Sequence, residues 1–284
     1  MLRLARAALF AVIPAELVLA VLLLSGVALP VPLIVTAEAA VLAVLTLETA
    51  TLLRLFRAAR RDGADRRAAL REAVRWLVPE KVRRLTGFEA RGMASLYLWA
   101  ARRRHGVPPG ATAVGYSREE RSTALLWLFA MAVETAGVDI LLRGIGAPAE
   151  LRYAVLVIDL YGLLIGLAVH AAAVTRPHVV SAGELRVRYA GFFDARIPRD
   201  RIAAVRAARN YNEQGVITVE DGRLAVAVAS QTNIVVELTE PVAIVRPLGR
   251  RAEVTAIRFF ADEPEAALQA LRTVGATEPV ALES

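Results

Sequence analysis

The sequence predicts an α+β membrane protein in which a four-helix transmembrane bundle precedes an antiparallel β domain. Four segments have the length and apolar character of membrane spans, an arginine-rich segment separates the second from the third, and short alternating runs follow Pro177. Hydrophobic residues make up 56% of the 284 positions, against about 45–50% in an average soluble domain. The chain has no cysteine, which excludes disulfides and thiolate chemistry.

Each predicted span is close to the ~20 helical residues that cross about 30 Å of hydrocarbon. The spans cover residues 7–27, 33–53, 123–142 and 153–174. Proline and glycine in the turns ALPVP and RGIGAPAEL favour two helical hairpins. These spans divide the chain into four predicted domains. They are the first hairpin (1–53), a cytoplasmic basic helical segment (54–121), the second hairpin (122–176) and the β domain (177–284).

The charge distribution predicts the orientation of the spans. Arg3 and Arg6 precede the first span, Arg176 follows the fourth, and arginine is dense between the second and third. The positive-inside rule therefore predicts cytoplasmic N- and C-termini. Arginine- and alanine-rich usage is typical of a GC-rich bacterial genome, so we expect a multi-pass protein of a bacterial cytoplasmic membrane whose first span is a retained signal anchor. This topology explains the net charge of +7 without nucleic acid as a partner.

The basic segment breaks at Asp62-Gly63 and at Pro79 and is predicted to be helical between the breaks. One face of the first helix is expected to be apolar, with Leu70, Val74, Leu77 and Val78. The rest of its surface is basic, with Arg66, Arg67, Arg71 and Arg75. Such a helix lies at a membrane interface and contacts anionic headgroups, or it packs on the spans with its arginines solvated. Arg102, Arg103 and Arg104 likewise indicate either a phosphate site or the retention of positive charge in the cytoplasm.

Seven ionisable side chains fall inside the predicted spans. They are Glu16, Glu38, Glu48, Glu134, Asp139, Asp159 and His170. An ionised carboxylate in hydrocarbon costs about 2.5–3.5 kcal/mol, so these groups are expected to face the bundle interior, water or one another. Asp139 has Arg143 one turn further on as an ion-pair partner, whereas Glu134 is expected to point into a polar interior.

The fourth span carries a small-xxx-small pair, Gly162 and Gly166, on the same face as Asp159 and His170. Such a pair lets a neighbouring helix approach closely, and in a homo-oligomer it is the expected contact between protomers. The polar groups of the spans serve as interhelical hydrogen-bonding groups, as a proton or cation path, or as a ligand site. No ligand-spaced or catalytic motif is present, so the sequence predicts neither a metal nor a cofactor, and it predicts that the protein is not an enzyme.

Residues after Pro177 form short alternating runs that predict a half-buried antiparallel sheet. The runs are ELRVRYA, FFDARI, GVITVE, RLAVAVA, NIVVELT, VAIVRP and EVTAIRFF. Asp221-Gly222 predicts a hairpin, and two capping boxes are expected, Ser117 with Glu120 before the third span and Asp262 with Glu265 before a last helix. About seven strands followed by one helix is the order of a pleckstrin-homology-like (PH-like) barrel or sandwich. Ser230, Gln231, Thr232 and Asn233 form either a polar binding lip of this domain or a tight turn.

Several stretches resemble a family of uncharacterised four-transmembrane-helix membrane proteins from high-GC Gram-positive bacteria that end in a bacterial PH-like domain. They are PHVVSAGELRVRYAGFFDARIPRDRIAAVRAAR, RLAVAVASQTNIVVELTEPV, VTAIRFFADEPEAAL and RHGVPPGATAVGY, and together they span most of the chain. The resemblance implies the architecture but carries no activity and no catalytic residues. PH-like domains in general suggest the binding of lipid or protein.

The sequence therefore favours a membrane-anchored binding, scaffold or regulatory module. Its PH-like domain and basic helices are expected to bind anionic lipids of the cytoplasmic leaflet or a protein partner. The alternative is a proton or cation transporter or channel that uses the carboxylates of the spans and His170.

Overall fold

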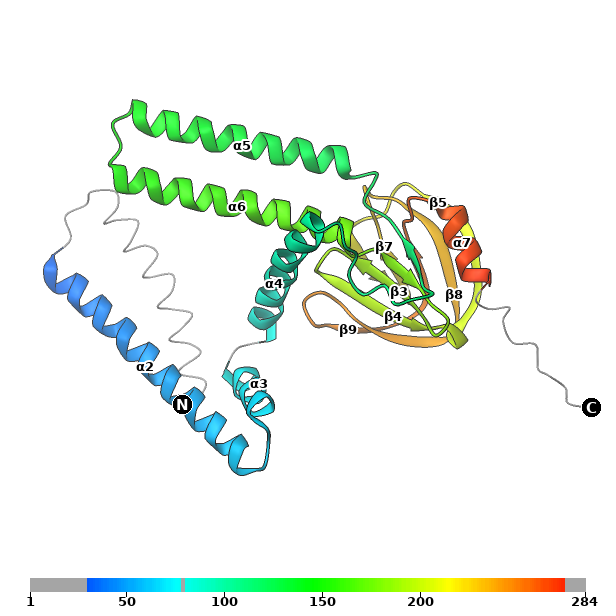
Figure 1. Ribbon diagram of the computed structural model, residues 1–284, viewed down its shortest axis with the longest axis horizontal. Coiled ribbons are helices and arrows are strands. Elements are labelled where there is room, and N and C mark those ends of the chain that lie inside the picture. The colour runs from blue at the N-terminus through cyan, green and yellow to red at the C-terminus, as the bar shows by residue number, and fades with distance from the viewer. Residues whose placement is uncertain (1–29, 78–79, 274–284) are drawn as a thin grey trace, which may run out of the picture. The chain divides into compact units, whose positions relative to one another are not determined.

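The computed structural model describes residues 30–77 and 80–273, which fall into two compact units (Figure 1). The first unit comprises Met1–Arg83 and Ala132–Tyr161, and the second comprises Arg84–Met131 and Gly162–Ser284. Two long helices, α5 (Arg121–Gly144) and α6 (Ala149–Thr175), contribute to both units. The β domain and most of α4 (Glu80–Ala100), from Arg84 onward, belong to the second.

The first unit contains α2 (Val31–Arg61) and α3 (Arg66–Leu77), which pack against each other. The predicted break between them is confirmed, and Gly63 supplies the positive φ of +87° that the turn needs. Ala69 and Ala73 of α3 are fully buried, whereas Leu70 is half exposed. The two alanines are thus the buried residues among the described side chains of α3, and the contact of the apolar face at Leu70 with a membrane stays a prediction.

Among the described residues, two helices are long and apolar enough to cross a membrane, α5 and α6. They contain the predicted spans 123–142 and 153–174. The predicted span 33–53 lies within α2, and the span 7–27 lies outside the described residues. The prediction of four spans is thus confirmed only for the helical character and length of two.

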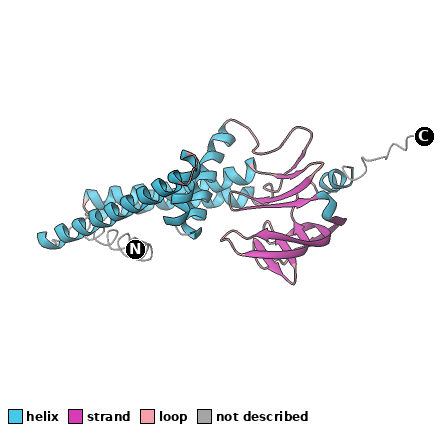
Figure 2. Cartoon of the chain, turned by 90° about the horizontal axis from the view of Figure 1, so that it is seen from below, coloured by secondary structure: helices cyan, strands magenta, loops and turns pink. Residues whose placement is uncertain are grey.

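The described residues of the β domain form nine strands in two sheets (Figure 2). The four-stranded sheet has the order β1 (Thr112–Val114), β2 (His178–Val180), β3 (Glu184–Tyr189), β4 (Phe193–Pro198). The five-stranded sheet has the order β5 (Ile202–Asn210), β8 (Thr232–Val245), β9 (Arg251–Phe259), β7 (Arg223–Val226), β6 (Ile217–Glu220). A short 3-10 helix, η1 (Arg199–Arg201), precedes β5, and α7 (Pro264–Thr273) ends the domain.

The topology departs from the predicted antiparallel sheet in three ways. Strand β7 runs parallel to β9, so the second sheet is mixed. The runs NIVVELT and VAIVRP form one strand, β8, because Pro241 falls in a register shift between Glu237 and Val242 where no ladder donor is needed. Strands β1, β2 and β5 were not predicted, and β1 lies in the segment that was predicted to be helical. The hairpin at Asp221-Gly222 is confirmed, whereas the seven-strand PH-like barrel is not established by this arrangement.

One hydrophobic core lies between the two sheets and α7. Alternation along β4 buries Phe193, Ala195 and Ile197 and turns their neighbours outward. The opposite sheet and the helix complete the core with Leu224, Ile234, Ile257, Leu268 and Leu271. The outward face of β3 and β4 is consequently free to carry charge, and it forms one wall of the candidate site.

Both predicted capping boxes are wrong. Helix α5 begins at Arg121, after Ser117 and Glu120, and the Glu120 carboxylate instead accepts hydrogen bonds from the Tyr189 hydroxyl (3.2 Å) and the Ala229 amide (2.8 Å). The Asp262 carboxylate accepts the Arg118 amide hydrogen bond (3.0 Å), away from α7. Both acids thus tie the segment before α5 to the β domain.

Candidate functional site

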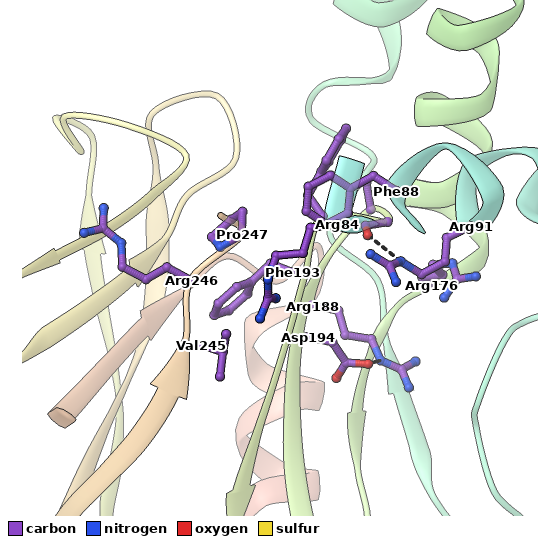
Figure 3. A pocket seen from close by; sticks show the side chains of 13 residues that line it. Arg84, Phe88, Arg91, Arg176, Arg188, Phe193, Asp194, Val245, Arg246 and Pro247 are labelled. Carbon is purple, nitrogen blue, oxygen red and sulfur yellow. Dashed lines mark hydrogen bonds and ion pairs between the residues drawn. The ribbon is translucent and has the colours of Figure 1, made fainter. Parts of the chain in front are cut away.

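A cavity of about 210 Å³ opens between α4, the β3–β4 turn and the β8–β9 loop (Figure 3). We call it the arginine cavity, because Arg84 and Arg91 of α4, Arg176 after α6, and Arg188 of β3 line it. Its other lining residues are Phe88, Ala190, Gly191, Phe192, Phe193, Asp194, Val245, Arg246 and Pro247. All of these residues belong to the second unit.

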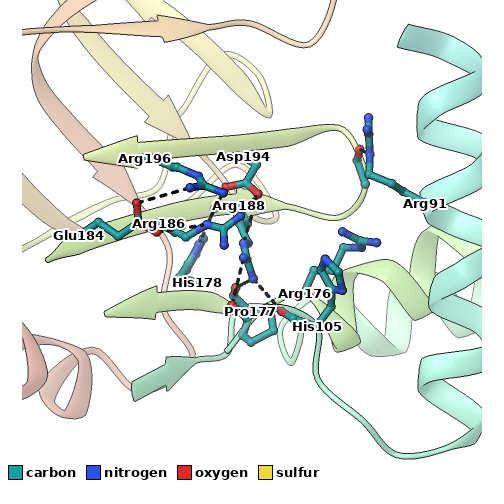
Figure 4. A network of polar contacts seen from close by, with 12 residues as sticks. Arg91, His105, Arg176, Pro177, His178, Glu184, Arg186, Arg188, Asp194 and Arg196 are labelled. Carbon is teal, nitrogen blue, oxygen red and sulfur yellow. Dashed lines mark hydrogen bonds and ion pairs between the residues drawn. The ribbon is translucent and has the colours of Figure 1, made fainter. Parts of the chain in front are cut away.

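Strand alternation explains why charged side chains reach this wall. In β3 the core takes Leu185 and Val187, so Arg186 and Arg188 point to the opposite face. Arg188 pairs in register with Asp194 of β4, which places a guanidinium beside a carboxylate (Figure 4). The β3–β4 turn then meets α4, where a Cβ at Gly191 would lie 3.4 Å from the Arg91 Cβ.

Arg188 is a structural cation. Its side chain is only 2% exposed, and it donates to the backbone carbonyls of His105 (2.9 Å), Gly106 (3.2 Å) and Pro177 (3.3 Å). Its Nε lies 3.5 Å from the Asp194 carboxylate. These acceptors hold the loop after α4 and the segment after α6 against the four-stranded sheet.

Arg176 is also buried, at 8% exposed, but it has a different environment. Its Nε donates to the Ser95 hydroxyl (3.1 Å), which in turn donates to the Arg91 carbonyl (2.7 Å). Among the described residues, no carboxylate forms an ion pair with Arg176. Burial lowers the pKa of its guanidinium, and the nearby charge of Arg91 lowers it further.

Arg91 of α4 lines the cavity beside these two buried cations. Its Nε donates to the Gly191 carbonyl (2.8 Å), and its guanidinium sits 5.1 Å from the Phe88 ring centroid. Arg84 lies two turns before Arg91 on the same face of α4. The β8–β9 loop closes the opposite side, where Arg246 points away from the cavity (Figure 3).

The arginine cavity has an excess of positive charge. Asp194 is the one acidic residue in its lining, and that carboxylate is already shared between Arg186 and Arg188. Guanidinium groups offer planar sets of donors that match the oxygens of phosphate or carboxylate. The arrangement can therefore receive an anion. Among the described residues, no three histidine, aspartate or glutamate side chains come together as metal ligands.

The described carboxylates of the predicted spans do not line the arginine cavity, and their environments differ from one another. Asp139 pairs with Arg143 (2.6 Å), as predicted, and also with Arg152 of α6 (3.2 Å). Glu134 is exposed and Asp159 is half-buried. Glu38 and Glu48 lie on α2, and Glu16 lies outside the described residues. Ion conduction by these groups stays a prediction.

The predicted packing face of α6 is used within the chain. A Cβ at Gly166 would lie 3.1 Å from Leu128, and one at Gly162 would lie 3.6 Å from Met131, both on α5. His170 is buried and makes an edge contact with Trp99 of α4, with ring centroids 5.9 Å apart. The glycine pair thus lies against α5, and a contact between protomers at this pair stays a prediction.

The arginines predicted to bind headgroups do not line the arginine cavity. Arg66, Arg67 and Arg71 are exposed on α3, Arg75 lies on the same helix, and Arg102, Arg103 and Arg104 are exposed after α4. The sequence did hold signals for the cavity. Arg84 and Arg91 are seven residues apart on one helix, and Arg188 alternates with core residues in ELRVRY. Neither pattern shows that the two segments meet.

Of the two alternatives predicted for residues 230–233, the structure shows the tight turn. Ala229 and Ser230 have φ values of 49° and 59°, and Val228 and Gln231 exchange both backbone hydrogen bonds. Thr232 and Asn233 are buried, and the Asn233 amide bonds to the backbone of Ala261 in both directions. The prediction of a surface lip is therefore wrong for Thr232 and Asn233.

No protein-family model, no curated protein and no solved structure matches this chain. The resemblance to the four-helix membrane family stays a prediction, and the site is interpreted from its own chemistry.

Proposed function

We propose that the protein is a membrane-anchored binding module whose PH-like β domain receives an anionic phosphate group in the arginine cavity. The observation that carries the proposal is a cavity lined by five arginines, in which the one carboxylate is already paired. The ligand class follows from charge. A phosphate brings two or three acceptor oxygens to donors that have lost part of their hydration, so each hydrogen bond is charge-assisted.

The position of Arg176 supports an anionic lipid as the source of that phosphate. Arg176 directly follows α6, one of the two helices with the length and apolarity of a membrane span. If the basic residues mark the cytoplasmic side, Arg176 lies at the level of the inner headgroups. Arg66, Arg67 and Arg71 then add a nonspecific electrostatic attraction to the anionic surface, because exposed arginines near such a surface each contribute about 1 kcal/mol.

The test is ligand-dependent thermal stability of the full chain in detergent. The probes are dihexanoyl phosphatidic acid, dihexanoyl phosphatidylcholine and inorganic phosphate. A ligand that binds only the folded state at a hundred times its Kd stabilises by about 2.7 kcal/mol. We expect a shift with phosphatidic acid that exceeds the shift with phosphatidylcholine. A comparable shift with inorganic phosphate would assign the site to soluble phosphate rather than lipid.

The variants that link this shift to the cavity lie on α4. Arg84→Gln and Arg91→Gln are each expected to weaken binding at least tenfold. Arg83→Gln is the matched control, because Arg83 is the neighbour of Arg84 but does not line the cavity. An unchanged shift in both cavity variants, or no shift in the wild type with any probe, would overturn the proposal.

A further inference from the structure

The β8–β9 loop carries an exposed apolar side chain, Leu248, that does not line the arginine cavity. Residues 246–250 connect β8 to β9, and the loop is closed by the pairing of Val245 with Arg251. The Leu248 side chain stands at its tip, 63% exposed, next to Gly249 with a φ of +95°. Val245 at its base is also exposed. An apolar side chain held at the tip of a turn makes no contribution to the core of this domain.

The charges that flank Leu248 are all positive. Arg250 and Arg251 are exposed and Arg246 is half-buried, and the segment VRPLGRR contains no acid. Arg246 also points away from the arginine cavity (Figure 3). An apolar tip between arginines matches the interface of an anionic bilayer, where the apolar group enters the acyl region and the cations remain among the headgroups.

The arginine cavity fixes where this loop lies relative to the membrane helix. Val245 and Pro247 line the same cavity as Arg176, which directly follows α6. The loop and the end of α6 are therefore separated by no more than a cavity of about 210 Å³. A membrane that contains α6 brings its headgroup layer to the level of this loop.

From this geometry we infer that the β8–β9 loop is a membrane-inserting element that places Leu248 in the anionic inner leaflet. The inference rests on the proposed function only in placing Arg176 at the inner headgroup level. It adds a second contact with the bilayer besides the helices, and this contact orients the mouth of the arginine cavity toward lipid rather than toward the cytosol.

The absence of cysteine in the chain allows a direct test. The variant Leu248→Cys carries an environment-sensitive NBD fluorophore in the full chain, reconstituted in nanodiscs with 30% phosphatidylglycerol or with phosphatidylcholine alone. The control is Asp200→Cys, an exposed position in η1 just beyond the end of β4 that is remote from the cavity. We expect blue-shifted emission at position 248, quenching by nitroxides on the acyl chains, and protection from aqueous iodide. Position 200 should show the opposite behaviour.

A second variant separates insertion from simple proximity. In the Leu248→Cys background, Arg250→Gln with Arg251→Gln should reduce the acyl-chain quenching at least twofold and remove the difference between the two lipid compositions. Position 248 with the same iodide quenching as position 200 in phosphatidylglycerol nanodiscs would overturn the inference. That result leaves the phosphatidic acid shift of the detergent experiment unaffected, so failure of the loop and failure of the cavity are distinguishable.

Discussion

Two groups of arginines in this chain differ in what surrounds them. Arg66, Arg67 and Arg71 on α3 are exposed, so water solvates their charge. Arg176 and Arg188 beside the β domain are buried, and the protein must replace the lost hydration. Each of these arginines adds one positive charge to the net charge. Only the buried ones require partners, and the partners that each one has indicate its role.

The comparison extends to the two buried arginines themselves. Arg188 has three carbonyl acceptors and an ion pair with Asp194. Arg176 has the Ser95 hydroxyl and, among the described residues, no carboxylate. In the part of the chain that the structure describes, the Arg188 Nε has no hydrogen-bond acceptor, so the two arginines differ in the ion pair and in the number of carbonyl acceptors. A buried cation without a carboxylate partner costs stability unless a ligand compensates. In our proposal, this difference separates a structural arginine from a binding arginine.

The largest expected effect is at Arg188. Arg188→Met leaves buried carbonyls and Asp194 without their donor, so we expect a loss of about 3–5 kcal/mol in the free energy of unfolding. Thermal unfolding of the full chain in detergent measures it. The control is Arg196→Gln, because Arg196 is exposed on the neighbouring strand and its contact with Glu184 is 4.0 Å long. Its cost should stay within about 0.5 kcal/mol. Equal effects would remove the distinction between buried and exposed arginines.

Arg176 should respond in the opposite direction. Replacing Arg176 by Met removes a buried charge that faces Arg91 and has no carboxylate partner, so the unliganded protein should gain about 1–2 kcal/mol. The same variant should lose the stabilisation by phosphatidic acid. A destabilised Arg176→Met protein that still responds to the lipid would make Arg176 a structural residue like Arg188.

His178 extends the comparison to a buried histidine, whose ring is hydrogen-bonded to the backbone of Arg188. Its Nδ1 accepts the Arg188 amide hydrogen bond (2.9 Å), and its Nε2 lies 3.0 Å from the Phe260 carbonyl oxygen, so the neutral ring donates there. Burial lowers the pKa of His178 to about 3, although the Phe260 hydrogen bond opposes this. The pKa of His178 in the folded protein is below its unfolded value of about 6.5. The stability that the neutral ring contributes is therefore complete above pH 6.5 and is lost progressively as the pH falls toward 3.

This linkage should lower stability by about 1.4 kcal/mol at pH 5.5 relative to pH 8. Thermal unfolding as a function of pH measures it, and His178→Asn should flatten the profile between pH 5.5 and 7. His105→Asn is the comparison, because burial and then the charges of nearby arginines also lower the pKa of His105, although its side chain is exposed; the flattening should therefore be smaller than in His178→Asn. A profile that keeps its slope in His178→Asn would assign the pH dependence to other groups.

The sequence predicted local features better than the places where segments meet. The length and apolar character of two segments were sufficient to predict α5 and α6. Asp221-Gly222 was sufficient to predict the hairpin between β6 and β7. The pair of Asp139 with Arg143 followed from helical spacing. Contacts between distant segments have no such signal. Nothing in the sequence shows that α4 lies beside the β3–β4 turn, so the arginine cavity could not be found from it.

Strand β5 shows a second limit of sequence interpretation. Its sequence IAAVRAARN is rich in alanine and arginine, which favour helix, and it lacks strict alternation. Pairing with β8 nevertheless makes it a strand, with a register shift after Ala207. Tertiary pairing thus overrides local propensity.

The smallest effect is expected for an exposed arginine of α3. Arg67→Gln changes an exposed side chain, so the free energy of unfolding should change by less than about 0.5 kcal/mol. It should also leave the phosphatidic acid shift of the full chain intact, because Arg67 does not line the arginine cavity. The measurement is the same thermal titration that tests Arg84→Gln. A loss of the shift in Arg67→Gln equal to that in Arg84→Gln would show that net positive charge, rather than the buried geometry around Arg176, determines binding.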